Sequence, residues 1–215
     1  MSRSTAIRIF IADDHPIVRQ GLRRIVEADA GMAISGEAGD AATLLSALAT
    51  AATDLVLLDV SMPGGPFLDT LRDLRARHPS IRVLALSVHP EDQWAVRALR
   101  AGASGYLTKD HSPEQLLEAI RRVYRGGKYV SPALAEQLAQ QLENGAGRAP
   151  HELLSDREFE IMRRLGSGLT VSQIAGELAL SVKTVSTYRT RILEKMAFAT
   201  NADLVRYAAR HGLIA

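Results

Sequence analysis

The sequence predicts an α/β domain with a parallel sheet, followed by a smaller all-helical domain. Two observations lead to this prediction. Up to about residue 130, short apolar runs alternate with segments whose apolar residues recur at spacings of three and four, the periodicity of amphipathic helices. Beyond residue 150 the strand-like runs stop, and helix start signals follow one another. A chain of 215 residues is long enough for two modest domains.

The first part of the chain contains five predicted βα units. The predicted strands are residues 7–12, 32–35, 55–58, 82–87 and 105–107, and the predicted helices are residues 17–28, 41–51, 68–77, 91–101 and 113–125. Because the strands are apolar throughout, we expect a parallel sheet covered by helices on both faces. Five such units in this length favour the flavodoxin-like (βα)5 winding, whose ligands bind beyond the carboxyl ends of the strands.

A break in this pattern separates the two domains. Residues 131 to about 141 are rich in Ala, Leu and Gln and are predicted to be helical, whereas residues 144–150 contain Gly and Pro and are predicted to be flexible. The expected organisation is an α/β domain in residues 1–130, a helical and flexible linker in 131–150, and a second domain in 151–215.

The second domain begins with consecutive helix start signals. Capping boxes begin at Ser155 and Thr170, Ser181 is expected to cap a longer helix that runs to Met196, and Thr200 begins a fourth helix. Two short helices, a tight turn and a longer basic helix are typical of a helix-turn-helix arrangement. We therefore expect an all-α, four-helix domain of this type.

Composition narrows the functional classes. The chain has no Cys, which excludes disulfides and thiolate metal sites, and no segment approaches the ~20 apolar residues that cross a bilayer. A cytoplasmic location is the expectation. The net charge of +2 hides a local excess, since residues 181–196 hold four basic side chains and one acidic side chain. This excess marks either a nucleic-acid contact surface or an ordinary solvated helix face.

Charged and hydroxyl side chains lie at the ends of the predicted strands. Asp13 and Asp14 follow the first strand, Asp59 the third and Lys109 the fifth, and Ser87 ends the fourth. Close carboxylates repel one another unless a cation lies among them, and Mg²⁺ suits such a site because it keeps positions for water or phosphate oxygens. A carboxylate can also act as a nucleophile and form an aspartyl phosphate. The alternative, that these acids are solvated turn formers, is disfavoured by their joint occurrence at several strand ends.

Several segments resemble the receiver-domain signatures of two-component response regulators, namely residues 11–16 (IADDHP), 58–64 (LDVSMPG), 85–87 (ALS) and 102–109 (GASGYLTK). The resemblance implies that Asp59 accepts a phosphoryl group from a sensor histidine kinase. It also implies that Asp13 and Asp14 hold Mg²⁺ together with Asp59 and the backbone carbonyl of Ser61.

The same resemblance assigns roles to three further residues. Ser87 is implied to be the switch hydroxyl that moves toward the phosphoryl group, and Tyr106 the aromatic residue that follows it. Lys109 is implied to be the cationic partner of the phosphoryl group.

Two features near this site are less regular. Where the family usually has an acidic residue and Gly before the third helix, this chain has Pro66 and Phe67. Phe67 lacks the backbone freedom of Gly, which puts the loop geometry beyond Asp59 in doubt. His89 is interpreted as an exposed loop residue, with an influence on the lifetime of the phosphoryl group as the alternative.

The basic helix of the second domain has two different faces. Val182, Val185, Ile192 and Met196 fall near one stripe and are expected to pack into the core. The outward residues are expected to be Lys183, Ser186, Thr187, Thr190 and Arg191. Small hydroxyls between cations suit a helix in the major groove of double-stranded DNA, where cations contact phosphates and short polar groups approach base edges.

Residues 154–158 (LSDRE), 174–175 (IA) and 181–188 (SVKTVSTY) resemble the LuxR-type helix-turn-helix. With the receiver signatures, nearly the whole chain is similar to the NarL/FixJ subfamily of response regulators. By this resemblance Lys183, Thr184 and Tyr188 contact the DNA backbone, and Ser186, Thr187 and Thr190 are the candidates for reading bases.

Two more sets of residues complete the expected site. Thr170 and Ser172 begin the preceding helix and are placed to donate hydrogen bonds to a DNA phosphate. The last helix has one face with Leu204, Tyr207, Ala208 and His211, and packing within the domain would account for some of them. The family resemblance implies that this helix also pairs two copies of the chain, with these residues as the candidates for the contact.

Other functions fit less well. A haloacid-dehalogenase-like phosphatase needs a second Asp two positions after its nucleophile, where this chain has Ser61, and residues 166–170 lack the Lys of a nucleotide-binding P-loop. A ligand-sensing LuxR-type regulator would not need carboxylates at strand ends. We therefore predict a transcription factor rather than an enzyme, switched by Mg²⁺-dependent phosphorylation of Asp59. Its expected partners are a sensor histidine kinase, double-stranded DNA, RNA polymerase and a second copy. The remaining alternative is an orphan regulator of the same fold that acts independently of phosphorylation.

Overall fold

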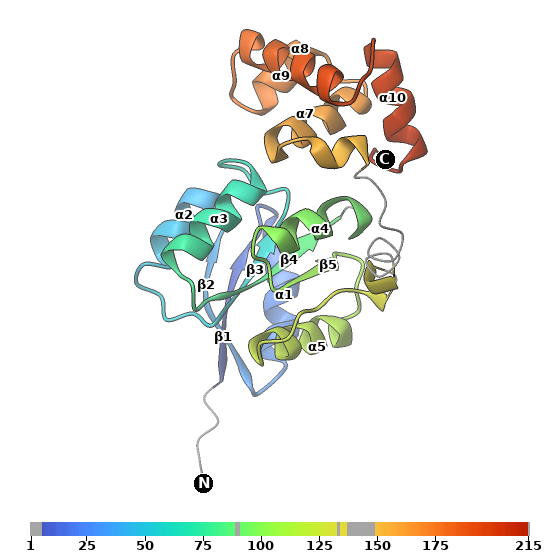
Figure 1. The fold of residues 1–215 in the computed structure, drawn as a ribbon. Helices are drawn as coiled ribbons and strands as arrows, with labels where there is room; N and C mark the ends of the chain where they lie inside the picture. Colours follow the sequence, from blue (N-terminus) through green and yellow to red (C-terminus); the bar gives the residue numbers. More distant parts are fainter. Residues whose placement is uncertain (1–5, 89–90, 133, 137–148, 215) are drawn as a thin grey trace. The chain divides into compact units, whose positions relative to one another are not determined.

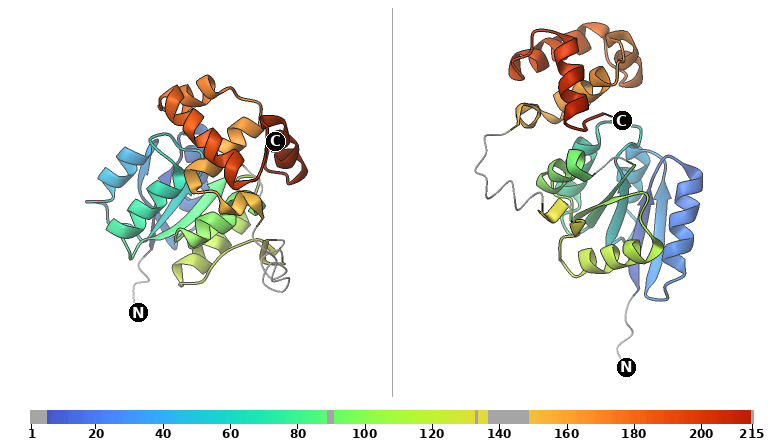
Figure 2. Two further views of the ribbon diagram at one scale, coloured as in Figure 1. Left: turned by 45° about the horizontal axis from the view of Figure 1, so that its top comes forward. Right: turned by 90° about the vertical axis from the view of Figure 1, so that its right-hand side faces the viewer.

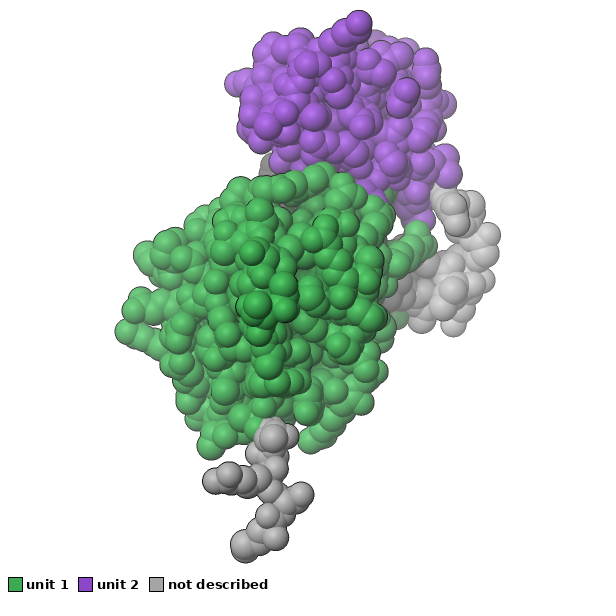
Figure 3. Space-filling view, turned by 90° about the vertical axis from the view of Figure 1, so that its left-hand side faces the viewer, with its two compact units in different colours: residues 1–140 green, residues 141–215 purple. Residues whose placement is uncertain are grey.

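The computed structural model describes residues 6–88, 91–132, 134–136 and 149–214, without the side chains of residues 91–93. The chain divides into two compact units, residues 1–140 and residues 141–215, which Figure 3 colours separately. The predicted role of His89 and most of the predicted linker, residues 137–148, lie outside the described residues.

The first unit is built on a five-stranded parallel sheet in the order β2-β1-β3-β4-β5. Its elements are β1 (Ile7–Ala12), α1 (Pro16–Glu27), β2 (Met32–Ala38), α2 (Ala41–Ala47), β3 (Leu55–Asp59), α3 (Phe67–Arg77), β4 (Arg82–Ser87), α4 (Glu91–Arg100), β5 (Gly105–Thr108) and α5 (Pro113–Tyr124). Helices α1 and α5 cover one face of the sheet, and α2, α3 and α4 cover the other (Figures 1 and 2). The predicted α/β class and winding are confirmed.

The core lies on both faces of this sheet. Ile9 and Ile11 of β1 are fully buried and belong to one apolar cluster with Leu22 of α1 and Ile120 of α5. Phe10, which points to the opposite face, is buried as well. Because helices cover both faces of the sheet, the side chains on both sides of each strand are buried. This explains why the strands are continuously apolar and do not alternate between apolar and polar residues.

Strand β2 is longer than predicted and continues to Ala38. Gly36 and Glu37 are poor strand formers. Gly36 nevertheless fits here because its missing side chain leaves room for the ring of Phe10, which would lie 2.5 Å from an added Cβ atom. The pairing of β1 with β2 shifts register between Ile9 and Phe10, beside this contact.

Two predicted helices of the first unit differ from the observed chain. Helix α2 ends at Ala47, not near residue 51, because Leu48 is its C-cap and the following residues turn. The linker helix is described only in its first turn, where Ser131 accepts hydrogen bonds from the backbone N–H groups of Leu134 and Ala135. Leu134 is buried, so this turn belongs to the packing of the first unit.

The second unit is all-helical. It consists of the 3-10 helix η1 (Pro150–Leu153), α7 (Asp156–Gly166), α8 (Val171–Glu177), α9 (Val182–Lys195) and α10 (Asn201–Arg210). Helix α7 contacts both α9 and α10, and α8 packs on α9. The predicted caps at Ser155, Thr170, Ser181 and Thr200 all accept the expected backbone hydrogen bonds. Among the described residues, no helix combines the length and apolar composition needed to span a bilayer.

Candidate functional site

The acidic and basic residues predicted at the strand ends meet at one edge of the sheet. Asp13 follows β1, Asp59 is the last residue of β3, and Lys109 follows β5. The backbone N–H of Lys109 donates to the carbonyl oxygen of Ser87 at 2.6 Å, which extends the β4–β5 ladder by one step and places Lys109 beside the acids.

Lys109 bridges two buried carboxylates. Its Nζ atom lies 2.6 Å from Asp13 Oδ2 and 3.0 Å from Asp59 Oδ1. Burial lowers the pKa of Lys109, but the hydrogen bonds and charges of the two carboxylates outweigh this effect, so its pKa is raised overall. Lys109 is therefore a permanent cation at neutral pH, shared between Asp13 and Asp59.

Asp59 has an incompletely satisfied carboxylate. Its side chain is about 1% exposed, and Oδ1 accepts from the backbone N–H of Ser61 at 3.2 Å. Its Oδ2 atom is buried without a hydrogen-bond partner among the described residues. Burial raises the pKa of the Asp59 carboxyl above its ordinary value of 3.8, and Lys109 offsets part of that increase. The unsatisfied oxygen has the free lone pairs that a ligand or an electrophile requires.

Asp14 lies at the rim of this site with His15. His15 Nδ1 is 2.8 Å from Asp14 Oδ1, and the His15 backbone N–H donates to Asp13 Oδ1 at 2.8 Å. Arg19 Nη1 donates to the carbonyl oxygen of Asp13 at 2.6 Å. No role for His15 or Arg19 was predicted from the sequence. The position of His15 directly after two acidic residues was a usable signal in the sequence. No sequence signal pointed to Arg19.

The acidic cluster has the donor set of a divalent cation site. Ligand atoms of Asp13, Asp14, His15 and Asp59 lie within 4.8 Å of one another. Carboxylate oxygens are the ligands that Mg²⁺ takes, and the unpartnered Asp59 Oδ2 is available to bind it. The residues therefore fit the metal that the sequence analysis predicted.

Ser87 and Tyr106 lie next to this edge. Ser87 ends β4 and is fully buried, and the residue before it, Leu86, is the β4 partner of Asp59. Tyr106 is in β5 and is also fully buried. Ser87 therefore provides a buried hydroxyl at the carboxyl end of β4, one residue beyond the strand partner of Asp59.

The loop after Asp59 accommodates Pro66 and Phe67 without strain at Phe67. Gly64 and Gly65 have φ values of +103° and +141°, so the left-handed backbone lies at these two glycines and not at Phe67. Pro66 is the N-cap of α3, and Phe67 is the first residue of that helix with a buried side chain. The backbone freedom of Gly is therefore used at Gly64 and Gly65, and Phe67 adopts the backbone of α3.

Helix α9 presents most of the predicted polar face. Lys183, Ser186, Thr187, Thr190 and Arg191 are all exposed, whereas Thr184 and Tyr188 are half-buried. The predicted core stripe is correct for Val185, Ile192 and Met196 but wrong for Val182, which is 50% exposed. Val182 is the first residue of α9, so no preceding turn or neighbouring helix covers it.

A hollow of about 270 Å³ lies on this face, lined by Lys183, Thr184, Thr187, Tyr188 and Arg191. All of these residues belong to the predicted DNA-contact set. Ser172 at the start of α8 is exposed as expected. Thr170 is exposed as well, and its hydroxyl donates to Gln173 Oε1 at 2.8 Å within the capping box.

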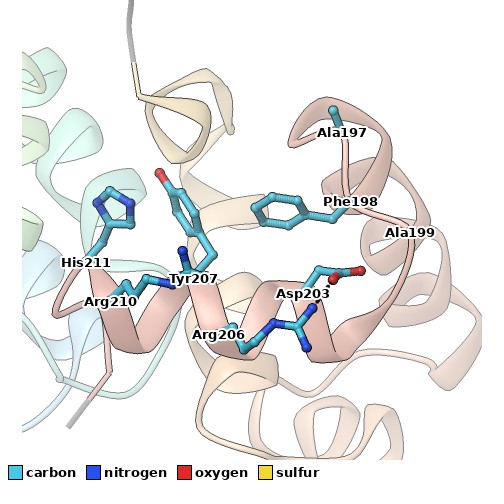
Figure 4. A pocket seen from close by; sticks show the side chains of 8 residues that line it. All are labelled: Ala197, Phe198, Ala199, Asp203, Arg206, Tyr207, Arg210 and His211. Carbon is cyan, nitrogen blue, oxygen red and sulfur yellow. Dashed lines mark hydrogen bonds and ion pairs between the residues drawn. The ribbon is translucent and has the colours of Figure 1, made fainter.

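The predicted contact residues of α10 divide into two groups. Leu204 and Ala208 are fully buried against α7, where Gly166 leaves space for both, so their assignment to a contact with a second copy is corrected to core packing. Tyr207 is half-buried and its hydroxyl lies 2.7 Å from His151 Nδ1, while His211 is exposed. A pocket of about 410 Å³ opens beside them (Figure 4), lined by Ala197, Phe198, Ala199, Asp203, Arg206, Tyr207, Arg210 and His211.

Comparisons with known proteins agree with this geometry in both units. Residues 9–121 match the family described as "Response regulator receiver domain", and residues 152–208 match "Bacterial regulatory proteins, luxR family". The response regulator GacA of Pseudomonas viridiflava is 38% identical over 209 residues, which cover 97% of this chain and 98% of GacA. The response regulator UvrY of Escherichia coli strain K12 is 37% identical over 208 residues, which cover 96% of this chain and 95% of UvrY.

Solved structures of the Salmonella typhimurium response regulator RcsB are also similar. One has 25% sequence identity and a TM-score of 0.73, covering 96% of this chain and 98% of RcsB. Another, RcsB bound to the promoter P1flhDC in the presence of the phosphomimetic BeF3−, has 25% identity and a TM-score of 0.70, covering 94% and 98%. With receiver and LuxR-type helix-turn-helix domains matched in one chain, this protein belongs to the two-component response regulators of the NarL/FixJ family.

Proposed function

We propose that this response regulator is switched by transfer of a phosphoryl group from a sensor histidine kinase to Asp59, and that phosphorylation changes DNA binding by the second unit. The observation that carries the proposal is the buried Asp59 carboxylate, whose Oδ2 atom has no hydrogen-bond partner among the described residues while Lys109 lies 3.0 Å from Oδ1. The site has a nucleophilic oxygen and a fixed cation side by side.

In the proposed transfer, Asp59 Oδ2 attacks the phosphorus of a phosphohistidine. The new P–O bond forms as the P–N bond breaks, and the kinase histidine keeps the electron pair. Lys109, held by Asp13 at 2.6 Å, stays next to the transferred group and offsets its negative charge. Asp13, Asp14, Asp59 and the Ser61 carbonyl would hold Mg²⁺, which offsets charge on the phosphoryl oxygens when it is bound.

The response to phosphorylation is proposed to begin at Ser87 and Tyr106. A phosphoryl group on Asp59 adds acceptor oxygens at the end of β3, and the Ser87 hydroxyl is the donor that moves toward them. Tyr106 follows into the space that Ser87 leaves, which alters the surface formed by β4, α4 and β5. We propose that this surface change frees or pairs the DNA-binding units in the cytoplasm, with RNA polymerase as a further partner.

For the second unit, the proposal is that α9 lies in the major groove. Lys183 and Arg191 contact phosphates, together with Thr184 and Tyr188, and Ser172 donates to a phosphate at the start of α8. Ser186, Thr187 and Thr190 face the base edges. Tyr207 and His211 remain the proposed contacts between two copies, because they are the accessible members of the predicted set.

The test is phosphoryl labelling with acetyl phosphate and Mg²⁺. Wild-type protein should form an acyl phosphate that hydroxylamine releases, and Asp59→Ala should form none. Equal labelling of both proteins would place the acceptor elsewhere. An absence of labelling in the wild type, together with normal sequence-specific DNA binding, would favour the orphan regulator that acts independently of phosphorylation.

A further inference from the structure

The threonines of α9 present methyl groups rather than hydroxyl donors. Thr187 Oγ1 donates to the carbonyl of Lys183 at 3.0 Å, and Thr190 Oγ1 donates to the carbonyl of Ser186 at 3.2 Å. A threonine hydroxyl has one proton, so a hydroxyl that donates to the carbonyl one turn back has none left for a base edge. The groups that remain outward are the γ-methyl and an oxygen lone pair.

Thr184, at the start of the same helix, has a hydroxyl that lies beside the N-cap residue. Its Oγ1 lies 2.7 Å from Ser181 Oγ, which also accepts from the Thr184 backbone N–H as the cap of α9. The hydroxyl of Thr184 is therefore engaged in the start of the helix. On this face of α9, hydrogen bonds to the helix backbone or to its N-cap residue occupy the hydroxyls of Thr184, Thr187 and Thr190.

Two of these threonines line the hollow on α9. Thr184, Thr187 and Tyr188 line it, and Lys183 and Arg191 add two cations. The cations suit phosphates, whereas the threonine methyls and the aromatic ring suit a small apolar group. Of the four DNA bases, thymine alone presents a methyl group in the major groove.

We propose that α9 selects thymine through its 5-methyl group, with Thr187 as the main specificity-determining residue and Thr190 as a second. This inference rests on the proposed function, because it requires α9 to lie in the major groove. In this proposal, the threonines recognise a base by apolar contact between methyl groups. The hydrogen bonds from threonine hydroxyls to base edges that the sequence suggested are not needed. Ser186 remains a polar reader of base edges.

The experiment compares thymidine with deoxyuridine, which differ only in the 5-methyl group. Full-length protein first enriches a duplex from a random pool, and each thymidine of that duplex is then replaced singly by deoxyuridine. We expect at least one replacement to weaken binding about fourfold, the fold-change that corresponds to the roughly 0.8 kcal/mol of a buried methylene. This arm uses only the wild-type protein, so it does not depend on the folding of any variant.

Three variants identify the residue that reads the methyl group. Thr187→Ser keeps the hydroxyl and loses the methyl, so it should bind the thymidine and deoxyuridine duplexes equally at the position that Thr187 contacts. Thr187→Val keeps a methyl without the hydroxyl and should retain the preference. Thr50→Ser makes the same change at an exposed threonine of the first unit, whose Oγ1 donates to Ala47 O at 3.4 Å, and should leave the ratio of affinities unchanged.

The outcomes separate this inference from the proposed function. A duplex that is enriched but loses no affinity at any deoxyuridine position would overturn methyl recognition and leave sequence-specific DNA binding intact. A Thr187→Ser protein that still discriminates at every position would remove Thr187 from the role. A pool that shows no enrichment either with or without acetyl phosphate and Mg²⁺ would overturn both proposals.

Discussion

Asp59 carries a buried charge that its neighbours compensate only in part. Lys109 contacts both Asp13 and Asp59, so one ammonium group serves two carboxylates. The raised pKa of Asp59 is the consequence, because burial disfavours the charged form more than Lys109 favours it. A divalent cation bound by Asp59 would relieve this imbalance, which makes the site responsive to Mg²⁺.

Replacing Asp59 by Asn should therefore stabilise the first unit at neutral pH without Mg²⁺. Loss of the buried charge is expected to raise the free energy of unfolding by about 1 kcal/mol, a typical size for a single-site effect. A carboxyl whose pKa is higher in the folded state contributes stability at low pH, and this contribution is lost as pH rises from the ordinary value of 3.8 through the folded-state pKa. The difference between the proteins should accordingly shrink as pH falls through that window.

Urea unfolding measures this difference, and Mg²⁺ provides the control. Because Asp59 is a proposed ligand, excess Mg²⁺ should stabilise the wild type more than Asp59→Asn. A variant that is less stable than the wild type in the absence of Mg²⁺ at neutral pH would show that the buried charge of Asp59 is not destabilising.

At single residues, the sequence predicts positions better than orientations. Asp13, Asp59 and Lys109 could be predicted because the carboxyl ends of parallel strands meet at one edge of the sheet. The contact of Arg19 with the Asp13 carbonyl could not, since it depends on how α1 leaves β1. The hydroxyl of Thr187 was likewise unpredictable, because its direction is a choice between side-chain rotamers that composition does not determine.

At the scale of elements, the loop between β3 and α3 depends on Gly64. Its φ of +103° is rarely adopted by other residues, and an added Cβ atom would lie 3.2 Å from the backbone N of Ala41. The backbone N–H of Ala41 in turn donates to the Pro63 carbonyl at 3.1 Å, so the loop is fixed against the start of α2. This geometry holds the residues just beyond Asp59.

Gly64→Ala should lower the free energy of unfolding by about 1–3 kcal/mol, the usual cost of a strained backbone conformation. Gly21→Ala is the matched control, because Gly21 lies within α1 and an added Cβ atom there would meet nothing within 4 Å. That change should be stabilising by about 0.5–1 kcal/mol. Thermal unfolding of both variants measures the two changes in stability. Equal changes would show that the loop does not constrain the backbone of Gly64.

Helix α9 is held to α7 by a buried acid. Glu158 is 3% exposed and accepts from Lys195 Nζ at 2.6 Å and from the backbone N–H of Ser155 at 2.7 Å. Burial raises its pKa, but the hydrogen bonds from Lys195 and Ser155 outweigh this, so the pKa of Glu158 is lowered overall. Its contribution to stability is present above the ordinary value of 4.5 and is lost as pH falls through the folded-state pKa.

Glu158→Gln should destabilise the second unit by about 1–3 kcal/mol, because buried hydrogen bonds to a charged group are lost. Glu177→Gln removes an exposed partner of Arg164 in the same unit and should change stability by less than about 1 kcal/mol. Unfolding followed by circular dichroism measures both variants. A Glu158→Gln protein as stable as Glu177→Gln would rule out a role for Glu158 in holding α9.

Element boundaries and packing partners show where sequence patterns stop being sufficient. The stripe along α9 gave Val185 and Ile192 correctly and failed at Val182, because the first turn of a helix extends past its neighbours. For α10, periodicity marks the apolar face but does not say what covers it. Gly166 of α7 leaves room for Leu204 and Ala208, and that space is visible only in three dimensions.

At the scale of the whole molecule, the chain joins two units that each have a core of their own. Asp59 lies in the first unit and α9 in the second, so phosphorylation can control DNA binding only if the units are coupled. Allosteric coupling of about 1–3 kcal/mol corresponds to roughly 5–150-fold in affinity. We expect a coupling of this size between Asp59 and α9.

The most direct test is the affinity of full-length protein for a duplex that it has enriched from a random pool, measured by fluorescence anisotropy with and without acetyl phosphate and Mg²⁺. We expect acetyl phosphate to change the affinity of the wild type by at least about fivefold. Asp59→Ala should bind the same duplex and should not respond to acetyl phosphate. An unchanged wild-type affinity after complete labelling of Asp59, or an equal response in both proteins, would contradict the coupling between Asp59 and α9.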